Sequence, residues 1–175
     1  MPDCYLSLGS NVGDRLRTLT TAVRSLSKLG RIEALSSVYE TDPQIVTDQA
    51  PFLNLCCLLF LPPDAGLRPG ELLDRLQGIE AQLGRDRGVE REKGPRTIDI
   101  DLILWDRVTV AEPLLRVPHP ELRNRQFVLR PILEMAPGLC HPQDGQSLAE
   151  ASAFLPGQGV YCYKETVVYS AGTDQ

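Results

Sequence analysis

Apolar residues recur along this chain with two spacings, one typical of strands and one typical of helices. Alternating or continuous apolar runs predict strands over residues 4–8, 32–39, 53–61, 97–105 and 160–169. Spacings of three and four residues predict amphipathic helices over residues 15–29, 71–83, 127–135 and 148–154. Asp14 can cap the first helix, and Gly84 can end the second.

This order of elements indicates the fold class. Strand, helix, strand, strand, helix and strand follow one another, which matches a split β-α-β sandwich of the α/β (α+β) class. Such a fold has a mainly antiparallel sheet with helices packed on one face and functional loops over the other. We expect one domain over residues 1–175, with a C-terminal extension over 147–169 and a frayed tail over 171–175.

Two carboxylates interrupt the apolar strand predicted over 97–105. Asp is depleted in strands, and Asp99 and Asp101 must project from the same face because side chains alternate. The opposite face presents Ile98, Ile100, Leu102 and Leu104, which indicates core. Two adjacent carboxylates offer hard oxygen ligands suited to one or two Mg²⁺ ions. A solvated sheet face or an arginine-paired acid pair is the alternative.

Basic residues flank this acidic strand in the sequence. The loop that leads into it carries Arg85, Arg87, Arg91, Lys93 and Arg96. Arginine binds phosphate oxygens through paired hydrogen bonds, although acidic residues interleave here and a solvated mixed-charge loop is the alternative. Arg96 is the strongest candidate for phosphate binding, since the Gly-Pro pair before it restricts the backbone that leads into the strand. After the strand, His119 and Arg125 belong to a second candidate anion-binding cluster.

One buried strand carries an amide at its start. Asn54 must hydrogen-bond within the predicted strand 53–61, and its side chain can offer both a donor and an acceptor to a heterocycle. Phe52 and Phe127 can supply flat faces for a ring. A satisfied backbone contact for Asn54 and core positions for both phenylalanines are the alternatives.

Composition narrows the function classes. The 175 residues are 42% hydrophobic and carry a net charge of -5, which argues against general nucleic-acid binding. Five cysteines without metal-ligand spacing favour a reducing compartment. No signal peptide and no apolar run long enough to cross a bilayer are visible, so we expect a cytoplasmic protein that does not bind membranes.

Several short motifs follow one another in a fixed order along the chain. The most specific string is Gly-Pro-Arg-Thr-Ile-Asp-Ile-Asp over 94–101. The other motifs are Leu-Gly-Ser-Asn over 8–11, Ser-Ser-Val-Tyr-Glu-Thr over 36–41, Phe-Leu-Asn over 52–54, Ile-Glu over 79–80, Gly-Arg over 84–85, Val-Pro-His over 117–119, Asn-Arg over 124–125 and Phe127. Together they resemble the motifs of the 6-hydroxymethyl-7,8-dihydropterin pyrophosphokinase family, and the resemblance extends from about Tyr5 to Pro137.

The resemblance implies a ferredoxin-like fold, ATP as co-substrate and a pterin as acceptor. Members transfer the β,γ-pyrophosphate of ATP to the pterin hydroxymethyl group and release AMP. The implied metal ligands are Asp99 and Asp101, which would hold two Mg²⁺ ions and act in catalysis with Arg85 and Arg96. The implied ATP contacts are Gln77, Glu80, Arg85, Arg87, Arg96, His119 and Arg125. The implied pterin contacts are Thr41, Pro43, Phe52, Asn54 and Phe127.

Two other functions share parts of this pattern. A two-metal nucleotidyltransferase also combines a Gly-Ser turn with paired aspartates, but there the turn lies shortly before the aspartates, and here most of the domain separates Gly9 from Asp99. A non-catalytic ligand- or RNA-binding module would not need carboxylates in an apolar strand. We therefore expect a monomeric enzyme with small-molecule substrates and no nucleic-acid partner.

Overall fold

The structure is a computed structural model that describes residues 3–43, 47–88 and 94–169. The expected roles of Arg91 and Lys93 and the expected fraying of 171–175 lie outside these residues. The strands are β1 (Asp3–Ser10), β2 (Arg31–Leu35), β3 (Tyr39–Thr41), β4 (Phe52–Phe60), β5 (Asp99–Trp105), β6 (Val110–Glu112), β7 (Leu115–Val117) and β8 (Val160–Cys162). The helices are α1 (Arg15–Leu26), α2 (Pro69–Gln82), α3 (Gln126–Met135) and α4 (Leu148–Phe154).

The main sheet is antiparallel, as predicted. Its strand order is β5-β1-β4-β3-β8, and β2 also pairs with β4. β1 lies between β4 and β5, and β5 stands at the end of the strand order. Strands β6 and β7 form a separate two-stranded ribbon. Within the described residues no helix has the length and apolarity needed to span a bilayer.

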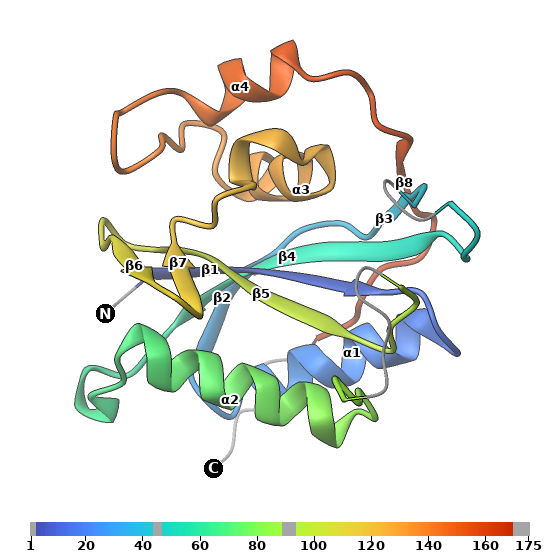
Figure 1. Cartoon of the computed structure of the whole chain (residues 1–175), viewed down its shortest axis with the longest axis horizontal. Helices are drawn as coiled ribbons and strands as arrows, with labels where there is room; N and C mark the ends of the chain where they lie inside the picture. The colour runs from blue at the N-terminus through green and yellow to red at the C-terminus, as the bar shows by residue number, and fades with distance from the viewer. Residues whose placement is uncertain (1–2, 44–46, 89–93, 170–175) are drawn as a thin grey trace.

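Helices cover both faces of the sheet, which corrects the expectation that they pack on one face. Helices α1 and α2 lie against one face, and α3 and α4 lie over the other (Figure 1). The physical reason is in β4, whose apolar run is buried on both sides: Leu55 packs toward α1 and α2, and Cys56 toward α3. A continuous apolar strand needs cover on both faces.

The strand predicted over 32–39 is divided into β2 and β3. Ser36 causes the break, because its hydroxyl accepts the Cys56 N–H at 2.9 Å and so takes the place of a backbone carbonyl. The next N–H, of Ser37, donates to the Glu134 carboxylate of α3 at 3.0 Å. The chain therefore leaves β4 briefly and rejoins it as β3. The strand predicted over 160–169 is also shorter, since β8 ends at Cys162.

A register shift in β5 corrects one predicted core position. Tyr5 of β1 pairs with Leu104, whereas the next residue, Leu6, pairs with Leu102, so Ile103 is an additional residue. Ile103 and Leu104 consequently both pack toward α3, and Leu104 does not share the face of Leu102 as the alternation predicted. The aspartates precede this bulge, so their alternation is undisturbed.

Candidate active site

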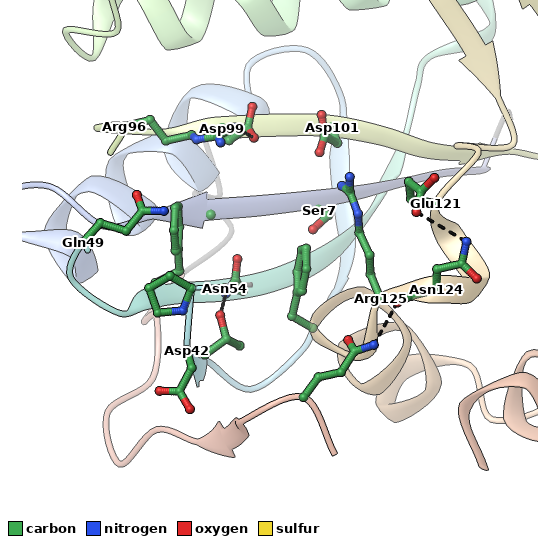
Figure 2. Close-up of a pocket in the computed structure, with 16 residues that line it drawn as sticks. Ser7, Asp42, Gln49, Asn54, Arg96, Asp99, Asp101, Glu121, Asn124 and Arg125 are labelled. Carbon is green, nitrogen blue, oxygen red and sulfur yellow. Dashed lines mark hydrogen bonds and ion pairs between the residues drawn. The ribbon is translucent and has the colours of Figure 1, made fainter. Parts of the chain in front are cut away.

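A cavity of about 550 Å³ opens on the α3 side of the sheet, beside the start of α3. Its size lies in the range usual for small-molecule sites. Figure 2 shows side chains from β5, β1 and β4 and from the loops around these strands pointing into this space. The lining residues are Ser7, Gly9, Thr41, Asp42, Pro43, Gln49, Phe52, Asn54, Arg96, Asp99, Asp101, Glu121, Asn124, Arg125, Phe127 and Gln158.

Two sides of the cavity differ in chemistry. We call Arg96, Asp99 and Asp101 the acidic side, and Thr41, Phe52, Asn54 and Phe127 the aromatic side. The sheet register places them next to each other, because Gly9 of β1 pairs with Asp99 on β5 and with Asn54 on β4. The paired carboxylates therefore share one cavity with an amide and two aromatic rings.

Asp99 is held between two arginines. Arg85 Nη1 lies 2.5 Å from Asp99 Oδ1, and Arg96 Nη1 lies 2.5 Å from Asp99 Oδ2. Burial alone would raise the pKa of Asp99, but the charges of Arg96 and Arg85 outweigh it and hold the pKa below its usual value. Asp99 is thus an ionised carboxylate whose position is fixed from both sides.

Asp101 shares the face of Asp99 but not its partners. No hydrogen bond to its carboxylate forms within residues 3–43, 47–88 and 94–169, and the Arg125 side chain extends toward it from the start of α3 (Figure 2). Burial and the neighbouring charge of Asp99 raise the pKa of Asp101 to about 7. A half-buried carboxylate without a hydrogen-bond partner among the described residues favours a cation beside it.

Glu80 of α2 binds two of the arginines near the acidic side. Its side chain is 1% exposed, and its two oxygens accept from Arg85 Nη1 at 2.7 Å and from Arg87 Nη2 at 2.5 Å. The Ile100 N–H of β5 donates to the same carboxylate at 2.7 Å. Glu80 therefore links α2 to the backbone between the two aspartates, and it does not line the cavity itself.

The aromatic side depends on an amide and on a glycine. Asn54 is 4% exposed, and its Nδ2 donates to Thr41 Oγ1 at 2.8 Å. A Cβ at Gly9 would lie 2.7 Å from Asn54 Oδ1, so only glycine leaves room for this amide. Arg96 lies 5.8 Å from the centroid of the Phe52 ring, close enough for a cation–π contact.

Asn11 connects the loops on the two sides. Its Oδ1 accepts the Arg96 N–H at 2.8 Å, and its Nδ2 donates to Gln49 Oε1 at 3.0 Å and to the Ala50 carbonyl at 3.1 Å. Asn11 is 4% exposed, so these bonds are shielded from water. The side chain fixes the backbone of Arg96 relative to the loop that carries Gln49.

His119 lies beside the cavity rather than in its lining. Its backbone N–H donates to the Ile103 carbonyl at the β5 bulge, at 2.9 Å. Its ring nitrogen Nδ1 accepts the backbone N–H of Glu121 at 3.1 Å. Burial and the charge of Arg125 lower the pKa of His119 to about 4. The imidazole is therefore neutral near pH 7, with its proton on Nε2.

The structure brings together most of the candidate residues. All five expected pterin contacts line the cavity, as do Asp99, Asp101, Arg96 and Arg125. The other candidates differ in position: Arg85, Arg87 and Glu80 lie behind the acidic side, and Gln77 is exposed on α2.

Some lining residues gave no signal in the sequence. Ser7 could have been found, because it lies opposite Asp101 in a strand with clear alternation. Asp42, Gln49, Glu121 and Gln158 lie on connecting segments without periodicity, and only the fold brings them to the cavity.

Asp99 and Asp101 are the residues that could hold a divalent cation. Within the described parts of the chain no group of three or more histidine, cysteine or acidic residues gathers at one point. Mg²⁺ sites that act on phosphates usually use one or two carboxylates and complete their coordination with water and the phosphates themselves. Two same-face aspartates, one of which has no hydrogen-bond partner in the described parts of the chain, fit that arrangement.

Comparison with known proteins agrees with this geometry. Residues 5–137 match the family model of 7,8-dihydro-6-hydroxymethylpterin-pyrophosphokinase. The chain is 43% identical over 163 residues to the 2-amino-4-hydroxy-6-hydroxymethyldihydropteridine pyrophosphokinase of Bacillus subtilis, covering 92% of this chain and 90% of that protein. It is 40% identical over 161 residues to the folic acid synthesis protein fol1 of Schizosaccharomyces pombe, covering 91% of this chain and 21% of that protein.

The chain thus spans about a fifth of the length of the fungal relatives it matches. A solved structure, wild-type Plasmodium falciparum HPPK-DHPS, superposes with a TM-score of 0.67 at 13% identity, covering 87% of this chain and 44% of that one. At this identity the likeness concerns the fold alone, and it confirms the ferredoxin-like α/β class. By its sequence, this chain belongs to the 7,8-dihydro-6-hydroxymethylpterin-pyrophosphokinase family.

Proposed function

We propose that this protein transfers the β,γ-pyrophosphate of ATP to the hydroxymethyl group of 6-hydroxymethyl-7,8-dihydropterin and releases AMP, a step of folate biosynthesis. One observation carries the proposal: the acidic side and the aromatic side line the same cavity. A triphosphate needs cations, and a pterin needs flat faces and an amide. The family assignment favours this reaction over a nucleotidyltransferase and over a non-catalytic binding module.

The acidic side provides the phosphate site in this proposal. Arg96 and Arg125 line the cavity, and Arg85 lies behind Asp99, so guanidinium groups approach from three segments of the chain. Guanidinium groups bind phosphate oxygens through paired hydrogen bonds and stabilise charge that develops during transfer. When a triphosphate enters, the two arginines that now bind Asp99 can share their donors with it. Neutral His119 would donate to it from Nε2.

The aromatic side provides the pterin site. Phe52 and Phe127 would stack on the two faces of the ring, and Asn54 would bind its polar edge. The bond from Asn54 to Thr41 fixes the amide before the ring arrives. The ring's position then determines where the hydroxymethyl oxygen meets the β-phosphorus.

We propose that Asp99 and Asp101 hold two Mg²⁺ ions. Mg²⁺, when bound, neutralises phosphate charge and lowers the pKa of a coordinated hydroxyl. The cavity lining offers no histidine or lysine as a general base among the described residues. Positioning of the two substrates is therefore the main contribution of this chain's own residues.

The proposal is tested by the nucleotide product. Purified protein is incubated with ATP, MgCl₂ and 6-hydroxymethyl-7,8-dihydropterin, and the nucleotides are separated by chromatography. AMP formed in proportion to the pyrophosphorylated pterin supports the proposal, whereas ADP would show transfer of one phosphate and contradict it. Omission of Mg²⁺ in a chelator-treated sample should abolish AMP formation. The single-domain organisation, monomeric state and cytoplasmic location stay predictions of the sequence, as do the absence of nucleic-acid and membrane partners.

A further inference from the structure

A segment outside the family match lies against the cavity. Residues 5–137 match the family model, yet Gln158, in the loop between α4 and β8, lines the cavity. This loop belongs to the C-terminal extension, whose last strand, β8, pairs with β3 at the aromatic side. The extension therefore contributes to the site and does not only cover the sheet.

The Gln158 carboxamide binds the backbone on both sides of Arg125. Its Nε2 donates to the Asn124 carbonyl at 3.0 Å, and its Oε1 accepts the Gln126 N–H at 3.0 Å. The Gln126 N–H is the first of α3 and has no acceptor within the helix, so this bond replaces a missing cap. Arg125, between the two contacts, extends into the cavity toward Asp101 (Figure 2).

The loop that carries Gln158 is itself fixed. Gln158 and Gly159 have φ values of +48° and +60°, the left-handed region that is unfavourable for glutamine. Such a conformation persists when surrounding contacts impose it. Here the Asp42 N–H donates to the Gly159 carbonyl at 3.1 Å, and Arg130 Nη1 donates to the Val160 carbonyl at 2.7 Å. A Cβ at Gly159 would lie 2.2 Å from the Asp42 carboxylate, so the approach is close.

We infer that Gln158 is a positioning residue for Arg125 in the proposed pyrophosphoryl transfer, on which this inference rests. The carboxamide holds the two peptide groups that flank Arg125, and the fixed loop holds the carboxamide. Arg125 therefore enters the cavity from a constrained backbone. Without this constraint Arg125 keeps its charge, but its guanidinium group is no longer held in one position. Small displacements of a phosphate-binding group reduce the rate of transfer.

The first test is Gln158→Ala. It removes both contacts and keeps the left-handed backbone, so kcat for AMP formation should fall about tenfold while both KM values change less than about threefold. The matched control is Gln143→Ala, because Gln143 is exposed on the loop before α4 and its side chain has no hydrogen-bond partner among the described residues. The control should equal the wild type.

A second variant separates positioning from stability. Gln158→Gly also removes the carboxamide, but glycine adopts a φ of +48° without strain. Its thermal midpoint should therefore be at least that of Gln158→Ala, while its kcat is equally low. If kcat instead recovers together with the thermal midpoint, Gln158 acts only on stability and the inference is wrong.

A double variant shows whether the effect passes through Arg125. Arg125→Lys keeps the charge and loses the planar fork, so residual activity can be measured. In that background Gln158→Ala should reduce kcat less than about threefold, because coupled residues are not additive. A full tenfold loss in both backgrounds, or a Gln158→Ala enzyme within twofold of wild type, would overturn the inference. A wild type that forms no AMP would instead refute the proposed function, and with it this role of Gln158.

Discussion

The acidic side and the aromatic side of the cavity are built by different forces. On the acidic side, Glu80 binds Arg85, which binds Asp99, so geometry depends on ion pairs between charged groups from three segments. On the aromatic side, Asn54 bonds one hydroxyl and fits against a glycine, so geometry depends on shape. Changes on the acidic side should therefore affect turnover and stability together, and changes on the aromatic side should affect pterin binding.

The largest effect is expected from the aspartates. Asp99→Ala and Asp101→Ala should each reduce kcat at limiting Mg²⁺ by about a thousandfold, because a proposed metal ligand is lost. Steady-state AMP formation across a Mg²⁺ titration measures this. Asp74→Ala, a substitution of an exposed aspartate on α2, is the control. Near-normal turnover in either cavity variant would exclude the two-metal role.

Glu80→Gln should have the next largest effect, and it should lower both the stability of the protein and its kcat. It removes the charge that faces two arginines, so the free energy of unfolding should fall by about 2–4 kcal/mol, and kcat should fall by about a hundredfold as Arg85 shifts. Urea denaturation and AMP formation measure the two. Glu71→Gln, in the exposed pair with Arg68 on the same helix, should change both far less. Unchanged stability in Glu80→Gln would show that the arginines hold Asp99 without it.

Gly9→Ala tests the aromatic side alone. The added Cβ displaces the Asn54 amide, so the Kd of the pterin should rise about tenfold while the Kd of an ATP analogue changes less than about threefold. Calorimetry with each ligand separates the two. Gly78→Ala is the matched control, since nothing lies within 4 Å of its Cβ position on α2, and it should gain about 0.5–1 kcal/mol of stability. If Gly9→Ala lowers the affinity for the ATP analogue as much as the affinity for the pterin, the two sides of the cavity do not act separately.

The smallest effect concerns His119 and pH. Burial and Arg125 lower its pKa to about 4, below the usual 6.5. Between these values the unfolded chain binds the proton and the folded chain does not, so stability is complete above pH 6.5 and falls as pH drops toward 4. From pH 7 to 5.5 the wild type should lose about 1 kcal/mol more than His119→Gln in urea denaturation. His141→Gln separates the contribution of the second histidine, whose pKa burial also lowers. Equal pH profiles for wild type and His119→Gln would show that His119 is solvated.

Prediction from sequence succeeded where the signal is local. Asp14 caps α1 by accepting the Arg17 N–H at 3.1 Å, and α4 spans the predicted residues. Prediction failed where contacts between residues far apart in the sequence determine the local structure. Ser36 ends β2 because Cys56 lies opposite, and the β5 bulge moves Leu104 to the other face. The two-sided cover of the sheet could have been expected from the continuous apolar run of β4.

The sequence by itself determined the paired aspartates on one strand face, since alternation is a property of the backbone, and the motif that assigns the family. Only the tertiary structure decided their different surroundings. Asp99 is bound by two arginines, whereas no hydrogen bond to the Asp101 carboxylate forms among the residues that the structure describes. Glu80 on α2 holds Arg85 beside Asp99, and Arg125, just before α3, extends toward Asp101 from the other face of the sheet. The contact of Gln158 with the residues around Arg125 also arises only on folding, since more than thirty residues separate them. Long-range electrostatics and packing carry no sequence periodicity.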